Sequence, residues 1–113
     1  MLWMALMAVM LGDAQTARPE PLPYEETVRC AGLTQAASEL EGGESAEGRA
    51  LSDAALYWSL TAAQAGVSVG RTATMAEADQ TRARIRAVRE LTANDEAARA
   101  NLQRCRARTP HLG

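Results

Sequence analysis

Residues 74–108 read TMAEADQTRARIRAVRELTANDEAARANLQRCRAR, a stretch that contains neither glycine nor proline. Its apolar side chains recur at intervals near three and four, the period of one helical face. These apolar positions are Ala78, Ile85, Val88, Leu91, Ala98, Leu102 and Cys105. Thr74 and Glu77 have the spacing of a capping box, which predicts a helix start at Thr74. The whole stretch is therefore predicted to be helical, with an arginine-rich outer face.

This stretch can form one helix or two. As a single helix it would be about 51 Å long, roughly twice the length of the other helices. Thr92 and Asp95 repeat the spacing of a helix start, and Asn94 is itself a favourable N-cap residue. Because a small core favours helices of matched length, we expect a break near Thr92–Asn94, with helices over 74–91 and 94–107.

A first helix is predicted over residues 24–41. The proline-rich segment 18–23, RPEPLP, precedes it and is expected to be an extended spacer. Gly42 and Gly43 follow it, as glycine commonly follows a helix C-terminus. One face carries apolar residues at helical spacing: Cys30, Leu33, Ala37 and Leu40.

A second helix is predicted over residues 50–65, after an acidic connection at 44–49 and before Gly66. One side carries Leu51, Ala55, Trp58, Ala62 and Ala65. Leu56 and Leu60 are expected to widen this apolar stripe. As the most apolar helix, it is expected to lie deepest in the fold.

The amino terminus resembles a secretory signal. Residues 2–11, LWMALMAVML, form an unbroken apolar run, and small residues suit cleavage after Ala14 or Thr16. A ten-residue helix is about 15 Å long, half the thickness of a membrane core. The run lacks a preceding basic segment, so an uncleaved N-terminal anchor is the alternative. Residues 1–17 are thus assigned as a signal peptide or anchor, which predicts a periplasmic or secreted protein that contacts the membrane only through this segment, and only if the segment is uncleaved.

The chain has two cysteines, Cys30 and Cys105, each on the apolar face of a predicted helix. In an exported chain such a pair is expected to form a disulfide. Closing so long a loop stabilises a fold by about 4 kcal/mol in the chain-entropy model. The bridge also requires the first and last helices to be neighbours.

Together these features predict an all-α fold, a small up-down bundle of three to four short helices closed by one disulfide. The bundle domain covers residues 24–108, and 109–113 form a flexible tail. The 113-residue chain suits one domain, and its alanine-rich composition without phenylalanine suits closely packed helices better than sheets.

Charge is unevenly distributed along the chain. Residues 19–70 carry eight acids and two arginines, a net charge of −6, whereas 71–113 carry nine arginines and five acids, a net charge of +4. We expect the two halves to face each other and partly neutralise. A nucleic-acid partner is not expected, because the domain is not net basic and lacks aromatic stacking residues.

The sequence offers little for catalysis. His111, the single histidine, lies in the tail, so neither a catalytic triad nor a multi-histidine metal site is expected. No glycine-rich phosphate loop, lysine or haem-attachment motif is present, and no cofactor is expected. The acids between Glu39 and Glu47 are flanked by small and polar residues, which favours a solvated connection. The protein is therefore not expected to be an enzyme.

Four residues are candidates for contact with a partner. Arg82, Arg86 and Arg89 share one helical stripe, which could pair with the acids of residues 39–47 or bind an anionic envelope protein. Tyr57 lies about 100° from the buried stripe and is expected to be half exposed. The leading functional hypothesis is a small exported helical module that binds a protein partner or supports an envelope assembly. The alternative is a bundle carrying a small apolar ligand.

Overall fold

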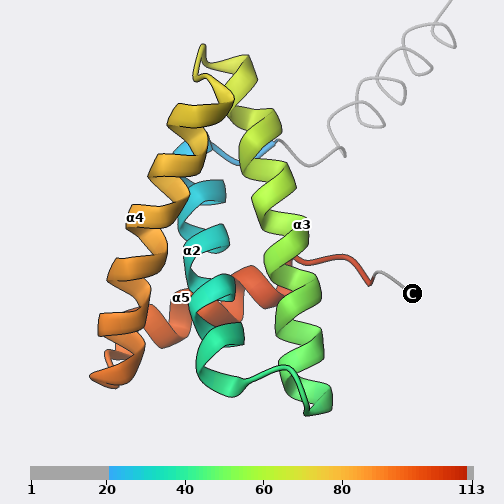
Figure 1. Ribbon diagram of the computed structural model, residues 1–113, viewed down its shortest axis with the longest axis vertical. Helices are drawn as coiled ribbons and strands as arrows, with labels where there is room; N and C mark the ends of the chain where they lie inside the picture. Colours follow the sequence, from blue (N-terminus) through green and yellow to red (C-terminus); the bar gives the residue numbers. More distant parts are fainter. Residues whose placement is uncertain (1–20, 112–113) are drawn as a thin grey trace, which may run out of the picture.

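The computed structural model describes residues 21–111 and shows four α-helices and no strand within them (Figure 1). The helices are α2 (Tyr24–Glu41), α3 (Ala46–Ser68), α4 (Ala73–Thr92) and α5 (Glu96–Ala107). The prediction of a small all-α bundle is confirmed. The signal or anchor assigned to residues 1–17 lies outside the described residues.

The expected break in the arginine-rich stretch is present, because α4 ends at Thr92 and α5 begins at Glu96. Asn94 lies between them with φ 57°, a left-handed conformation that a helix interior does not tolerate. Asp95 then caps α5, its side chain accepting a hydrogen bond from the Ala98 amide at 2.8 Å. The cap residue is thus Asp95 and not Asn94, which instead makes the turn.

The predicted bounds of the first helix agree with those of α2. Pro23 precedes its first residue, and its carbonyl accepts hydrogen bonds from the amides of Glu26 and Thr27. Gly42 follows the last residue with φ 85°, a conformation that glycine adopts without strain.

The second helix begins earlier than expected, at Ala46, so most of the predicted connection 44–49 is helical. Ser45 caps it by accepting a hydrogen bond from the Gly48 amide at 2.9 Å. Gly48 is buried against the Gly42 carbonyl and has no room for a Cβ atom. Gly48 therefore packs closely inside the first turn of α3 and does not break the helix, contrary to the prediction from the sequence.

The same helix also ends later, at Ser68, so the prediction that Gly66 stops it is wrong. Gly66 is buried, and a Cβ atom there would lie 3.2 Å from the Tyr24 ring. The chain turns instead at Gly70, which has φ 78°. Gly66 thus provides space for Tyr24 and leaves the helix intact.

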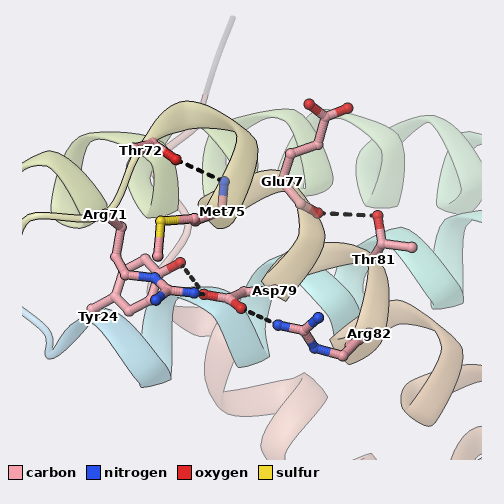
Figure 2. A network of polar contacts seen from close by, with 8 residues as sticks. All are labelled: Tyr24, Arg71, Thr72, Met75, Glu77, Asp79, Thr81 and Arg82. Carbon is pink, nitrogen blue, oxygen red and sulfur yellow. Dashed lines mark hydrogen bonds and ion pairs between the residues drawn. The ribbon is translucent and has the colours of Figure 1, made fainter.

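The start of α4 is set by Thr72 and not by the predicted pair of Thr74 and Glu77. The Thr72 hydroxyl accepts a hydrogen bond from the Met75 amide at 3.1 Å (Figure 2). The Glu77 carbonyl accepts a bond from Thr81, one turn further along.

The central helix is α2, so the expectation that the second helix lies deepest is wrong. Figure 1 shows α2 between α3 and α4, with α5 lying across them. Small side chains on several sides of α2 let its neighbours approach closely. Its buried residues are Thr27, Val28, Cys30, Ala31, Gly32, Leu33, Thr34, Ala36 and Ala37.

The buried side of α4 differs from the predicted apolar face. Ala78 and Ile85 are exposed, whereas Ala76 and Ala87 are buried. Ala83 lies where α4 contacts the backbone of α2. Because small residues give the closest helix contact, α4 packs Ala76, Ala83 and Ala87 against its neighbours and leaves the larger Ile85 outside.

Trp58 is the largest fully buried side chain, as expected for its place on the apolar stripe of α3. Its indole nitrogen donates a hydrogen bond to the Thr109 hydroxyl at 2.8 Å. Thr109 in turn donates to the Cys105 carbonyl at 2.8 Å. The first residue of the expected flexible tail, 109–113, is therefore attached to the core.

Cys30 and Cys105 form the expected disulfide, with sulfur atoms 2.10 Å apart and Cα atoms 5.5 Å apart. Both cysteines belong to the hydrophobic core. The bridge joins α2 to α5, so the predicted contact between the first and last helices is also confirmed.

Candidate functional site

Ion pairs join the acidic and basic halves of the chain, but not through the arginines that were expected to make them. Arg84 pairs with Glu39 at 3.1 Å, and Arg106 pairs with Glu47. The hydrogen bond from Arg106 lowers the pKa of Glu47 below its ordinary value. The acids of residues 39–47 are thus contacted from α4 and α5 by arginines outside the predicted stripe.

The three arginines of the stripe have a different environment. Arg82 pairs with Asp79, three residues earlier on the same helix. Arg86 and Arg89 are exposed, and within residues 21–111 neither forms an ion pair with an acid. Of the two alternatives predicted for this stripe, pairing with the acids of 39–47 is therefore wrong, and Arg86 and Arg89 lie exposed at the surface.

A groove of about 630 Å³ lies where α5 crosses α2 and α4. Its floor is apolar and includes Val28, Leu33, Ala83, Ala87 and Ala98. Its rim carries charges of both signs: Arg29 and Glu25 from α2, with Arg82, Arg86 and Glu90 from α4.

A second, shallower depression of about 540 Å³ continues the groove over the outer face of α4. It shares Arg82, Arg86 and Glu90 with the groove and adds Ile85 and Arg89. Ile85 is 43% exposed, so this depression combines an apolar contact with neighbouring guanidinium groups. We refer to the groove and this depression together as the arginine groove.

One end of the arginine groove is fixed by a polar network (Figure 2). The Tyr24 hydroxyl donates a hydrogen bond to Asp79 at 2.7 Å, and Arg71 donates to the same carboxylate oxygen at 2.7 Å. Arg82 donates to the other oxygen of Asp79. The network therefore connects the start of α2 and the α3–α4 turn to α4, and it holds the Arg82 guanidinium in place.

This network also shifts the titration of its members. The hydrogen bond from Tyr24, followed by that from Arg71, lowers the pKa of Asp79 below its ordinary value. Burial and the bond to Asp79 raise the pKa of Tyr24. At neutral pH the carboxylate is thus ionised and the phenol neutral, the states that the hydrogen bonds require.

Tyr57 is half buried as predicted, but it lies apart from the arginines. Its ring meets that of Trp58 edge to face, with centroids 5.1 Å apart. It does not line the groove or the depression. The structure therefore unites three of the four predicted contact residues and separates Tyr57 from them.

Sequence reasoning missed the other walls of the groove. Val28 and Arg29 come from α2, whereas Ala98 comes from α5. These helices are distant in sequence and meet only through the disulfide and the crossing of α5. The single available signal was Cys105, since its pairing with Cys30 places α5 against the first half of α2.

The lining of the arginine groove is suited to binding. It combines small apolar side chains with guanidinium and carboxylate groups, which provide contact area and charge.

Between residues 21 and 111, no three His, Cys, Asp or Glu side chains lie close enough to hold a metal ion. None of the helices in that range is long and apolar enough to cross a membrane.

Compared with protein-family models, characterised proteins and solved structures, this chain matches none of them.

Proposed function

We propose that this protein is a small exported binding module of the cell envelope, and that the arginine groove receives a segment of a protein partner. The observation that carries this proposal is that Arg29, Arg86 and Arg89, which form no ion pair within residues 21–111, lie beside an apolar floor. Arg29 lies on one rim, and Arg86 lies on the opposite rim.

The chemistry of the groove indicates the kind of segment that fits it. Its floor of alanine, valine and leucine suits apolar side chains, and Ile85 extends this surface over α4. Guanidinium groups bind carboxylates through two parallel hydrogen bonds and are enriched at protein interfaces. Glu25 and Glu90 disfavour a purely acidic ligand, so the partner segment is one in which acidic and apolar residues alternate.

Export is supported by two features of the chain. The apolar run at residues 2–11 has the length of a signal core. The disulfide between Cys30 and Cys105 belongs to the type of bond that persists in oxidising compartments. The proposed location is therefore the periplasm or the extracellular space.

The test is a crosslinking pull-down from the native envelope with the full chain as bait. The Arg86→Gln/Arg89→Gln variant should lose the partner that the wild-type protein captures. Arg99→Gln/Arg104→Gln removes the same charge from α5 outside the groove and should retain the partner. Because exposed charges are screened by salt, capture by the wild-type protein should also decrease as salt is raised.

Equal capture by the wild-type protein and by Arg86→Gln/Arg89→Gln would contradict the proposal. A small apolar molecule that co-purifies with the protein and lies on Val28 and Leu33 would favour the alternative, a ligand-carrying bundle.

A further inference from the structure

Helix α3 is apolar on two opposite sides. Leu51, Trp58 and Ala62 are buried and face the core. Leu56 and Leu60, each 59% exposed, and Val67, 74% exposed, lie on the other side, so the expectation that Leu56 and Leu60 widen the buried stripe is wrong. Within residues 21–111, no other helix buries these three side chains.

The exposed apolar residues form one line along the helix. Leu56, Leu60, Ala63 and Val67 follow one another at intervals of four, three and four residues, the spacing of a single helical face. We call these four residues the outer stripe. A helix with apolar residues on opposite sides is typical of one that is covered on both.

No charged residue of α3 interrupts the outer stripe. From Ala54 to Gly70 the sequence contains no charged residue, although the outer side of α3 is open to solvent. By contrast, the exposed side of α4 carries Arg82, Arg86 and Arg89. Depletion of charge distinguishes the centre of a protein interface from the rest of a surface.

We propose that the outer stripe is the interface of a homodimer, in which α3 packs antiparallel against α3 of a second copy of this chain. The order of intervals, four, three, four, is the same in both directions. A two-fold axis between Leu60 and Ala63 therefore places Leu56 opposite Val67 of the second copy, and Leu60 opposite Ala63. Such self-complementarity is what a symmetric dimer interface requires.

The charges at the two ends of the outer stripe favour the antiparallel arrangement. Asp53 lies one turn before Leu56, and Arg71 lies just beyond the end of α3. In an antiparallel pair, Asp53 of each copy lies near Arg71 of the other, which also pairs with Asp79 of its own copy. A parallel pair would place like charges together and would align the two helix dipoles unfavourably.

The size of the interface predicts a weak dimer. Helix α3 runs from Ala46 to Ser68, and with this axis the two copies overlap from Ala55 to Ser68, a length of about 21 Å. A strip one helix wide along this overlap is about 250 Å² per copy, roughly a third of what a stable interface buries. The dimer should therefore be weak, with a dissociation constant between about 10 µM and about 1 mM, and should depend strongly on protein concentration.

A second copy fits this surface better than a membrane does. Helices that lie in a membrane surface carry lysine or arginine beside the apolar face, often with tryptophan or phenylalanine on it. The outer stripe has no such flanking cations between Ala54 and Gly70 and no aromatic residue among its four members.

The experiment is sedimentation equilibrium of the purified disulfide-bonded protein from about 1 µM to about 1 mM, a range that covers weak complexes. The average mass should rise from that of a monomer towards that of a dimer. A protein that stays monomeric at about 1 mM would overturn the proposal. So would a monomer that binds anionic phospholipid vesicles through Leu60.

Matched variants locate the interface. Leu60→Glu should raise the dissociation constant by about tenfold or more, since it buries a charge at the two-fold axis. Leu40→Glu changes a leucine that is 54% exposed on α2, and it should leave the constant unchanged. Equal weakening by both variants would overturn the assignment to α3.

The circular dichroism of each variant as a monomer checks that its helices are folded. Leu60→Ala provides a milder change at the same position.

Asp53→Arg tests the direction of the helices. In an antiparallel dimer it introduces repulsion with Arg71 of the second copy and should weaken the dimer severalfold. A tighter dimer would overturn the antiparallel arrangement. These variants lie outside the arginine groove, so their outcome is independent of the pull-down result.

Discussion

Gly32 lies in close contact between α2 and α4, and its missing side chain allows that approach. A Cβ atom at this position would lie 2.6 Å from both the Cβ and the carbonyl carbon of Ala83. Real Cβ atoms do not come this near to backbone, so a larger residue would require the two helices to separate. The short distance between α2 and α4 thus requires glycine at position 32, because its side chain is a single hydrogen atom.

Gly32→Ala should therefore lower the free energy of unfolding by about 1–3 kcal/mol, the usual cost of overpacking. Helix propensity alone would make the alanine variant more stable, by about 1 kcal/mol. A decrease in the free energy of unfolding therefore indicates overpacking. The measurement is urea unfolding followed by circular dichroism. Gly43→Ala is the control, because a Cβ atom there meets nothing within 4 Å. A Gly32→Ala variant more stable than the wild type would show that α2 and α4 are not in backbone contact.

The turn between α4 and α5 determines where the groove can form. It redirects the chain so that α5 crosses α2 (Figure 1), which lets Ala98 line the same groove as Ala87. A continuous helix would carry Ala98 past the end of the bundle. Two local features make the turn: the left-handed backbone of Asn94 and the cap formed by Asp95.

Asn94→Ala should lower the free energy of unfolding by about 1 kcal/mol, because alanine lacks the short polar side chain whose local hydrogen bonding lets asparagine tolerate a left-handed conformation. Asn94→Gly should be as stable as the wild type or slightly more so, because glycine adopts this conformation freely. Thermal unfolding of the three proteins provides the comparison. If Asn94→Ala instead gains both helicity and stability, α4 and α5 can form one helix and the observed turn is not required.

At the scale of the whole molecule, the disulfide holds together elements from opposite ends of the domain. Cys30 and Cys105 are 75 positions apart, and their bridge joins the central helix to the last one. The core it adjoins consists largely of alanine, which buries little apolar area per residue. The bridge therefore accounts for a large share of the stability of a domain of this size.

Replacing both cysteines with alanine should lower the free energy of unfolding by about 2–5 kcal/mol. Reductant should destabilise the wild-type protein to a similar extent and leave the double variant unaffected. Chemical unfolding with and without dithiothreitol gives both values. A double variant as stable as the oxidised wild type would mean that the alanine core alone is sufficient.

Local signals in the sequence were enough to predict the four helices and the disulfide that joins the first of them to the last. Proline before Tyr24 and glycine after Glu41 mark the ends of α2. The turn near Asn94 follows from its capping residues, and the cysteine pair indicates which helices are neighbours. These features act over a few residues or through a covalent bond, so they can be recognised in the sequence without knowledge of the packing.

Packing decided what local signals leave open. A glycine at position 66 could either end a helix or leave space for the Tyr24 ring, and the sequence does not distinguish these two roles. Helix α3 has apolar residues on both sides, and periodicity placed Trp58 inside correctly but did not show that Leu60 faces outward. The reason is physical: helical periodicity identifies faces, but which face is buried depends on the partners that the rest of the chain brings against it. The arginine groove, built from three helices, exists only after that choice is made.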